Sequence, residues 1–211
     1  MMEESVTKLV EGVSEKIIVC AKEEFLQKGY SDASLRTIAA KAGTTTGSIY
    51  SRFKDKEGLF CAIVEPVVDG LVDIFTETQK EFHAIDAEKQ SEIVGQYSED
   101  GMMNMIDDVY DHFEEFELLL NASYGTKYHD FVEQLVDIET EYTYKFMETI
   151  GFKESDDQVV TEEIIHIMAR TLFEGMFEVV RHNMSKEKAV MYIGMLEKYH
   201  HAGWDTVFKF D

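Results

Sequence analysis

Apolar residues recur every three to four positions along almost the whole chain, and this spacing strongly restricts the fold. In the first segment the repeat runs from Val6 through Ile17 to Phe25, which is the pattern of an amphipathic helix with one buried stripe. No segment alternates apolar and polar residues as a half-buried strand does. Only one proline, Pro66, occurs among 211 residues. The sequence therefore predicts an all-α protein.

The spacing and its glycine-containing breaks locate the individual helices. The first is predicted to end at Gly29, since glycine readily adopts the left-handed conformation that closes a helix. The others are predicted at 35–42, at 46–52, from Asp55 through Pro66, and at 87–97, 102–121, 126–150, 158–183 and 186–209.

The last two predicted helices are apolar on most of their faces, so both sides must be covered. In a chain of this size we expect another subunit to cover one of them. The predicted interface residues are Met168, Leu172, Met176, Val180, Met195, Leu196, Tyr199 and Trp204.

The charge of the chain is unevenly distributed. The formal net charge is −22, yet residues 1–60 hold nine basic and nine acidic side chains, whereas 61–211 hold 11 basic and 33 acidic ones. Residues 33–56 hold five basic side chains and one acidic. Such asymmetry is typical of a segment that touches a polyanion and is attached to an acidic body.

The sequence also predicts where the protein is located. No stretch approaches the roughly 18 apolar residues of a membrane span. The chain starts Met-Met-Glu-Glu, which is acidic where a secretory signal is basic. We expect a cytoplasmic protein without a membrane partner.

Two short predicted helices joined through Ala42-Gly43-Thr44 form the pattern of a DNA-binding helix-turn-helix. The second is narrow and polar enough to enter a major groove, and basic and aromatic side chains beside it can reach phosphates. The predicted DNA-binding residues are Ser34, Arg36, Thr37, Thr45, Thr46, Gly47, Ser48, Tyr50, Arg52, Lys54 and Lys56.

At these residues the chain resembles the tetracycline-repressor (TetR) family. The resemblance rests on residues 17–21, Phe25, Gly29-Tyr30, residues 34–39, Ala42-Gly43, Gly47-Ser48-Ile49-Tyr50, Phe53, Lys56 and Leu59-Phe60. It covers roughly 45 residues in a fixed order and spacing. Thr44-Thr45 stands where that family more often has Val-Ser, and Arg52 where it often has His, which puts any transferred base preference in doubt.

The resemblance implies a homodimeric transcription regulator, usually a repressor, that binds a palindromic DNA operator and a small-molecule effector. It assigns residues 1–55 to DNA binding and 56–211 to ligand binding and dimerisation. The last two helices would pack with their symmetry mates as a four-helix bundle. A regulator that acts through DNA alone, without a ligand, is an alternative.

The large domain also suggests where an effector would bind. Methionines and aromatics concentrate in 60–180, which favours an apolar pocket. The predicted pocket residues are Phe75, Met103, Phe113, Phe116, Phe131, Tyr142, Phe146, Phe173 and Phe177. The acidic body favours a cationic ligand over an anionic one, and the sequence does not identify a buried carboxylate beside an aromatic face.

A different class of protein competes with this interpretation. The pairs Glu163/His166 and Glu197/His200 have the Glu-x-x-His spacing that helical bundles use to hold two iron ions. No matching glutamates lie on an obvious inward stripe elsewhere, so the metal protein is the alternative and no metal or cofactor is predicted. The sequence contains no catalytic motif such as Gly-x-Ser-x-Gly or His-Glu-x-x-His, so we predict no enzyme.

Overall fold

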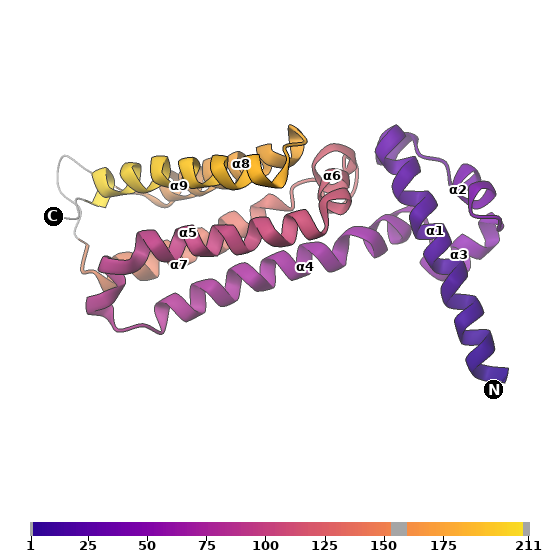
Figure 1. The fold of residues 1–211 in the computed structure, drawn as a ribbon, viewed down its shortest axis with the longest axis horizontal. Coiled ribbons are helices and arrows are strands. Elements are labelled where there is room, and N and C mark those ends of the chain that lie inside the picture. The colour runs from indigo at the N-terminus through magenta and orange to yellow at the C-terminus, as the bar shows by residue number, and fades with distance from the viewer. Residues whose placement is uncertain (1, 153–159, 209–211) are drawn as a thin grey trace. The chain divides into compact units, whose positions relative to one another are not determined.

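The computed structural model describes residues 2–152 and 160–208, with side chains over 12–152 and 160–206. All regular elements in these residues are α-helices, as predicted (Figure 1). They are α1 (Met2–Asp32), α2 (Leu35–Lys41), α3 (Thr46–Phe53), α4 (Lys56–His83), α5 (Ala87–Asp111), α6 (Phe113–Ala122), α7 (Val132–Thr149), α8 (Glu162–Arg181) and α9 (Lys186–Phe208).

Two predicted helix breaks have different outcomes. Gly29 interrupts the helical backbone of α1 with a φ of 73°, as its conformational freedom suggested. The break predicted at 98–101 is wrong, because α5 runs through it without interruption. Gly101 is buried, and a Cβ there would lie 2.8 Å from Cγ2 of Thr78. This glycine therefore permits the close approach of α4 and α5 instead of ending a helix.

The chain forms two compact units. The first contains the residues up to Asp69 together with His112–His129, and the second contains Gly70–Asp111 and the chain from Asp130. Helix α4 contributes residues to both. The predicted domain boundary between residues 55 and 56 stays a prediction.

The first unit is built around α1. The rings of Phe25 and Phe60 pack edge to face with centroids 5.2 Å apart. Lys22 on α1 lies 2.9 Å from the carboxylates of both Glu114 and Glu115 on α6. These ion pairs attach α6 to the first three helices, although 80 residues of sequence separate α1 from α6.

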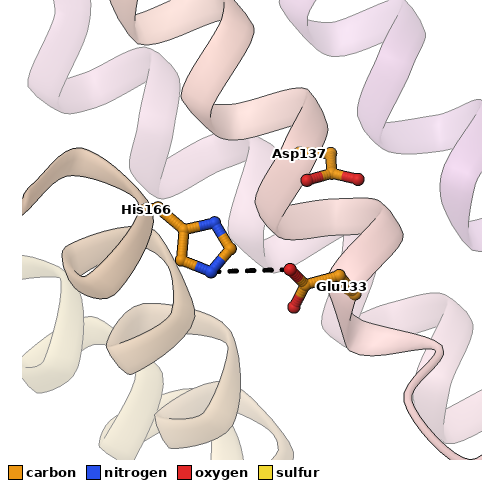
Figure 2. Close-up of side chains that lie close together, drawn as sticks. All are labelled: Glu133, Asp137 and His166. Carbon is orange, nitrogen blue, oxygen red and sulfur yellow. Dashed lines mark ion pairs between the residues drawn. The ribbon is translucent and has the colours of Figure 1, made fainter. Parts of the chain in front are cut away.

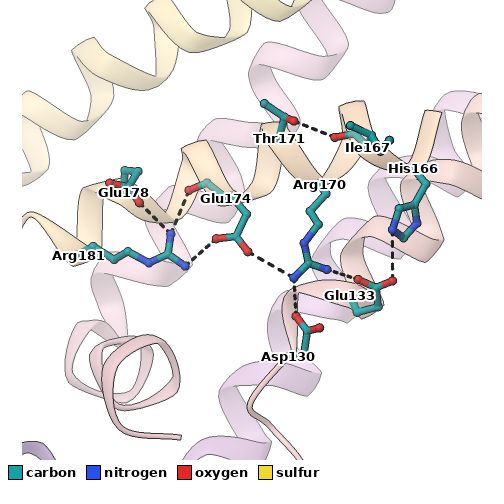
Figure 3. A network of polar contacts seen from close by, with 9 residues as sticks. All are labelled: Asp130, Glu133, His166, Ile167, Arg170, Thr171, Glu174, Glu178 and Arg181. Atoms are coloured by element: carbon teal, nitrogen blue, oxygen red, sulfur yellow. Dashed lines mark hydrogen bonds and ion pairs between the residues drawn. The ribbon is translucent and has the colours of Figure 1, made fainter. Parts of the chain in front are cut away.

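The second unit packs α8 against α7 and α9, and α9 against α5. Arg170 on α8 bridges three carboxylates (Figure 3). They belong to Asp130, which precedes α7, to Glu133 in the first turn of α7, and to Glu174 on the same helix as Arg170. Arg181 extends the same network through Glu174. Within the described residues, no helix combines the length and the apolar character that crossing a bilayer would require.

Candidate nucleic-acid interface and internal cavity

Helices α2 and α3 are joined by a tight turn whose geometry follows from its residues. Gly43 has a φ of 66°, and the amide of Thr44 donates to the carbonyl of Ala39 at 2.9 Å, which closes α2 as a left-handed residue typically does. The hydroxyl of Thr45 then caps α3 by accepting from the amide of Ser48 at 3.2 Å. Ile49 is fully buried and fixes α3 on the unit's core.

The opposite side of α3 is free of apolar packing. Thr45, Gly47, Tyr50, Ser51 and Lys54 are all exposed, and Tyr50 retains 53% of its surface. Four of these five are predicted contacts. Ser51 was not predicted because it lies outside the polar run of residues 45–48. Its position four residues after Gly47 is nevertheless a sequence signal for the same face of the helix.

Other predicted DNA contacts are engaged within the protein. Nη1 of Arg52 donates to the hydroxyl of Ser48 at 2.7 Å and to its carbonyl at 3.2 Å. Nζ of Lys56 donates to the carbonyls of Ser31 at 2.9 Å and Ala33 at 3.2 Å. The Lys56 ammonium therefore satisfies carbonyl groups at the end of α1.

The remaining predicted contacts lie beside α3 or partly under it. Arg36 is exposed, whereas Ser34, Thr37, Thr46 and Ser48 are half-buried. Among the residues whose side chains are described, neither Arg36 nor Lys54 has an ion-pair partner. The structure thus leaves these two cations available to an external anion.

The second unit contains a cavity of about 130 Å³ between its helices, called the internal cavity below, which is partly open to solvent. Its walls come from α4, α5, α7, α8 and α9. Of the predicted pocket residues, Phe75, Tyr142, Phe146 and Phe173 line it. Met103, Phe131 and Phe177 belong to the same unit but not to the lining, and Phe113 and Phe116 belong to the first unit. The pocket assignment itself stays a prediction.

Two carboxylates face this aromatic cavity, and sequence reasoning did not place them there. Oε2 of Glu139 accepts from Gln79 at 2.8 Å, and Oε1 of Glu197 accepts from Ser98 at 3.2 Å. Burial, followed by repulsion from Glu197, raises the pKa of Glu139 to about 7. Burial likewise raises the pKa of Glu197 and lowers that of His200, because each group loses the water that stabilises its charged form.

The two Glu-x-x-His pairs do not form a di-iron centre. Glu163 is exposed at the start of α8, and His166 lies 3.5 Å from Glu133 instead (Figure 2). Glu133, Asp137 and His166 are the one group of three or more His, Cys, Asp or Glu among the described residues whose geometry suits a metal ion. Glu133 is already paired with Arg170, so its charge is compensated without a metal.

The predicted interface residues of the last two helices separate into two faces. Leu172, Met176 and Val180 are buried inside the subunit, so they contribute to its own core. By contrast, the predicted residues Met195 and Tyr199 are 63% and 74% exposed. Ile167 and Met191, which were not predicted, are 60% and 70% exposed. Met168, Leu196 and Trp204 are half-buried. Sequence reasoning could not distinguish the faces because both are apolar.

Comparison with known proteins agrees with the local geometry. Residues 17–63 match the family model described as bacterial regulatory proteins, tetR family. The chain is 40% identical over 50 residues to the HTH-type transcriptional repressor BepR of Brucella suis. It is 41% identical over 66 residues to the HTH-type transcriptional regulator AcrR of Shigella flexneri. These matches span only 24% and 31% of the relatives' lengths, and 24% and 31% of this chain.

Solved structures resemble the chain over most of its length. SmeT, the repressor of a Stenotrophomonas maltophilia multidrug efflux pump, superposes with a TM-score of 0.63 at 18% identity, covering 90% of this chain and 89% of its own. NalD, the secondary repressor of a Pseudomonas aeruginosa multidrug efflux pump, gives a TM-score of 0.62 at 18% identity, with coverage of 90% and 95%. At this identity the likeness demonstrates a shared fold.

Proposed function

Because residues 17–63 match the model of the tetR family of bacterial regulatory proteins, we propose that this chain is a TetR-type regulator: a dimeric, ligand-responsive transcription regulator that binds a palindromic operator. The observation that carries this proposal is the exposed polar face of α3, presented by a capped helix-turn-helix. We propose repression as its action, released by a small apolar effector. Such a role belongs beside the chromosome, in the cytoplasm.

The predicted DNA contacts divide by chemistry. Thr46, Gly47 and Ser48 lie on the helix that would enter the major groove and are proposed to read base edges, together with exposed Ser51. Arg36, Tyr50 and Lys54 are proposed to bind phosphates, which set the position on DNA without reading sequence. Arg52 and Lys56 are proposed to support α3 and α1 through their internal hydrogen bonds.

Dimerisation is supported by the apolar residues left exposed on the last two helices. Met191, Met195 and Tyr199 are spaced four residues apart and lie on one face of α9. Ile164 and Ile167 are exposed on α8. We propose that these faces meet the same faces of a second copy, since large exposed apolar patches mark association sites.

Selection of duplexes from a random library by the full-length protein tests the proposal. We expect an enriched palindrome, because two identical half-sites about one helical turn apart suit a symmetric dimer. Sedimentation of the complex should give two chains per duplex. Recovery of unenriched sequences, or of a site occupied by one chain, would contradict it.

A further inference from the structure

We propose that the internal cavity binds a compact organic cation, held between the carboxylates of Glu139 and Glu197 and the surrounding aromatic rings. The inference rests on the proposed function in treating this ligand as the effector. It goes further by assigning the charge of the ligand and the two residues that recognise it.

The charge of the cavity wall favours a cationic ligand. Among the described lining residues there are two glutamates, three histidines and no lysine or arginine. Glu197 is only 5% exposed. An ionised carboxylate in such a place needs a partner of opposite charge. Among the described lining residues only the imidazole of His201 favours the charged form of Glu197, by lowering its pKa, and no permanent cation is present.

Within the described part of the chain, the side chains that donate hydrogen bonds to these carboxylates are neutral. Glu139 accepts from the Gln79 amide and, at 3.4 Å, from the Thr143 hydroxyl. Glu197 accepts from the Ser98 hydroxyl. These bonds orient the carboxylates without compensating their charge. The ammonium of Lys145 lowers the pKa of His83 at the cavity wall. Lys145 is itself exposed, and its ammonium is paired with the carboxylate of Glu141 at 2.6 Å.

Aromatic rings line the cavity and would contact the rest of such a ligand. The rings of Phe82 and Phe146 lie 5.7 Å apart, and those of Phe82 and Tyr97 5.4 Å. Aromatic faces attract cations, and most strongly where water is excluded. Nε2 of His200 is buried in the same wall and has no hydrogen-bond partner among the described residues, which leaves one further polar contact for a ligand.

Acidic residues also line a hollow beside the cavity. This more open hollow lies between α5 and α9 and shares Val94, Glu197 and His201 with the cavity. Its carboxylates are those of Glu92, Glu99, Glu197 and Asp205, and its one basic residue besides His201 is Lys198. A cleft lined mainly by one sign of charge concentrates the opposite ion. Glu197 thus lies where the acidic hollow adjoins the aromatic cavity.

The cavity volume sets the size of a suitable probe. At about 130 Å³ it is close to the roughly 150 Å³ that accommodates a benzene molecule in a protein core, so it takes the ring of a one-ring ligand. An ammonium group on that ring would lie towards Glu197, which also lines a more open hollow. Phenyltrimethylammonium carries one ring and a permanent charge. Its neutral isostere is tert-butylbenzene, and benzoate is a one-ring anion of similar size.

The test is titration of the full-length protein at about pH 8 with these three compounds, followed by the fluorescence of Trp204. Trp204 lines the cavity and is the only tryptophan of the chain. We expect phenyltrimethylammonium to bind at least about tenfold more tightly than tert-butylbenzene, and benzoate to bind most weakly. Equal affinities for the cation and its isostere, or no fluorescence response to either, would overturn the proposal.

Two variants locate the recognition. Glu139→Gln and Glu197→Gln should each weaken cation binding about tenfold or more while changing affinity for tert-butylbenzene by less than about threefold, which shows that the cavity is intact. Glu148→Gln, an exposed residue of α7, removes the same charge and should change neither. Unchanged cation affinity in both cavity variants would overturn the assignment.

DNA binding of the same preparations separates this inference from the proposed function. If the protein binds its selected duplex but shows no preference for the cation, the inference fails and the regulator stands. If the cation binds as expected but no duplex is selected, the regulator fails and the ligand assignment stands without its effector role. Release of the duplex by phenyltrimethylammonium, lost in Glu139→Gln, would support both.

Discussion

Glu139 lies in the cavity with the Gln79 amide as its closest described donor and Glu197 as a neighbouring carboxylate. Its pKa is about 7, compared with 4.5 for an ordinary glutamate. This difference makes the free energy of unfolding depend on pH. Between these two values the folded protein holds a proton that the unfolded chain has lost. Stability from this group is therefore present at low pH and falls as the pH rises towards 7.

Glu139→Gln should accordingly stabilise the protein more at about pH 8 than at about pH 5, by about 1–3 kcal/mol in the free energy of unfolding. The neutral amide keeps the shape of the side chain without the buried charge. Denaturant unfolding at both pH values measures the difference, with Glu148→Gln as the matched control. A stability difference that is the same at both pH values would show that Glu139 titrates normally.

At the scale of the element, α8 and α9 each divide into a core face and an exposed face. Met176 is fully buried within the subunit, whereas Met195 is 63% exposed. A charge introduced at these two positions should therefore have different effects. At Met176 it would enter the subunit's own core and lower its stability.

Met195→Glu should convert the dimer to a monomer while leaving the subunit folded, because each interface would then bury unpaired charges at a cost of several kcal/mol. Sedimentation velocity measures the association state, and circular dichroism measures the fold. Val19→Glu, at an exposed apolar position of α1, is the control and should stay dimeric. A dimeric Met195→Glu protein would place the interface on another surface.

At the scale of the whole molecule, a chain of net charge −22 is proposed to bind a polyanion. This is possible because the acidic excess belongs to residues 61–211, whereas Arg36 and Lys54 are exposed beside α3. Screening at physiological salt limits the repulsion from distant carboxylates to about 8 Å.

Lys54→Ala should reduce the dependence of operator affinity on salt by about 1.8 in the log–log slope, because the dimer loses one phosphate contact in each subunit and each contact is worth about 0.9. Lys56→Ala should leave that slope nearly unchanged and instead lower stability by about 1–2 kcal/mol, since its ammonium bonds the carbonyls of Ser31 and Ala33. Affinity titrations at several salt concentrations and thermal unfolding distinguish the two. Equal slopes for both variants and the unchanged chain would remove Lys54 from the interface.

The sequence by itself predicted the features that depend on interactions between residues close together in the chain. Helical spacing predicted an all-α chain, and two short helices joined through Ala42-Gly43-Thr44 predicted the helix-turn-helix. Each of these features depends on residues within a few positions of one another, so their order along the chain is sufficient.

Only the tertiary structure decided which of these side chains are available and which are buried. Of 42 acidic residues, it brought Glu139 and Glu197 to one cavity, although they are 58 positions apart on different helices. It also assigned Lys56 to carbonyls 23 and 25 residues earlier, and it buried Met176 while exposing Met195. The periodicity of a helix identifies apolar faces but not what covers them, because burial depends on contacts between elements that are distant in sequence.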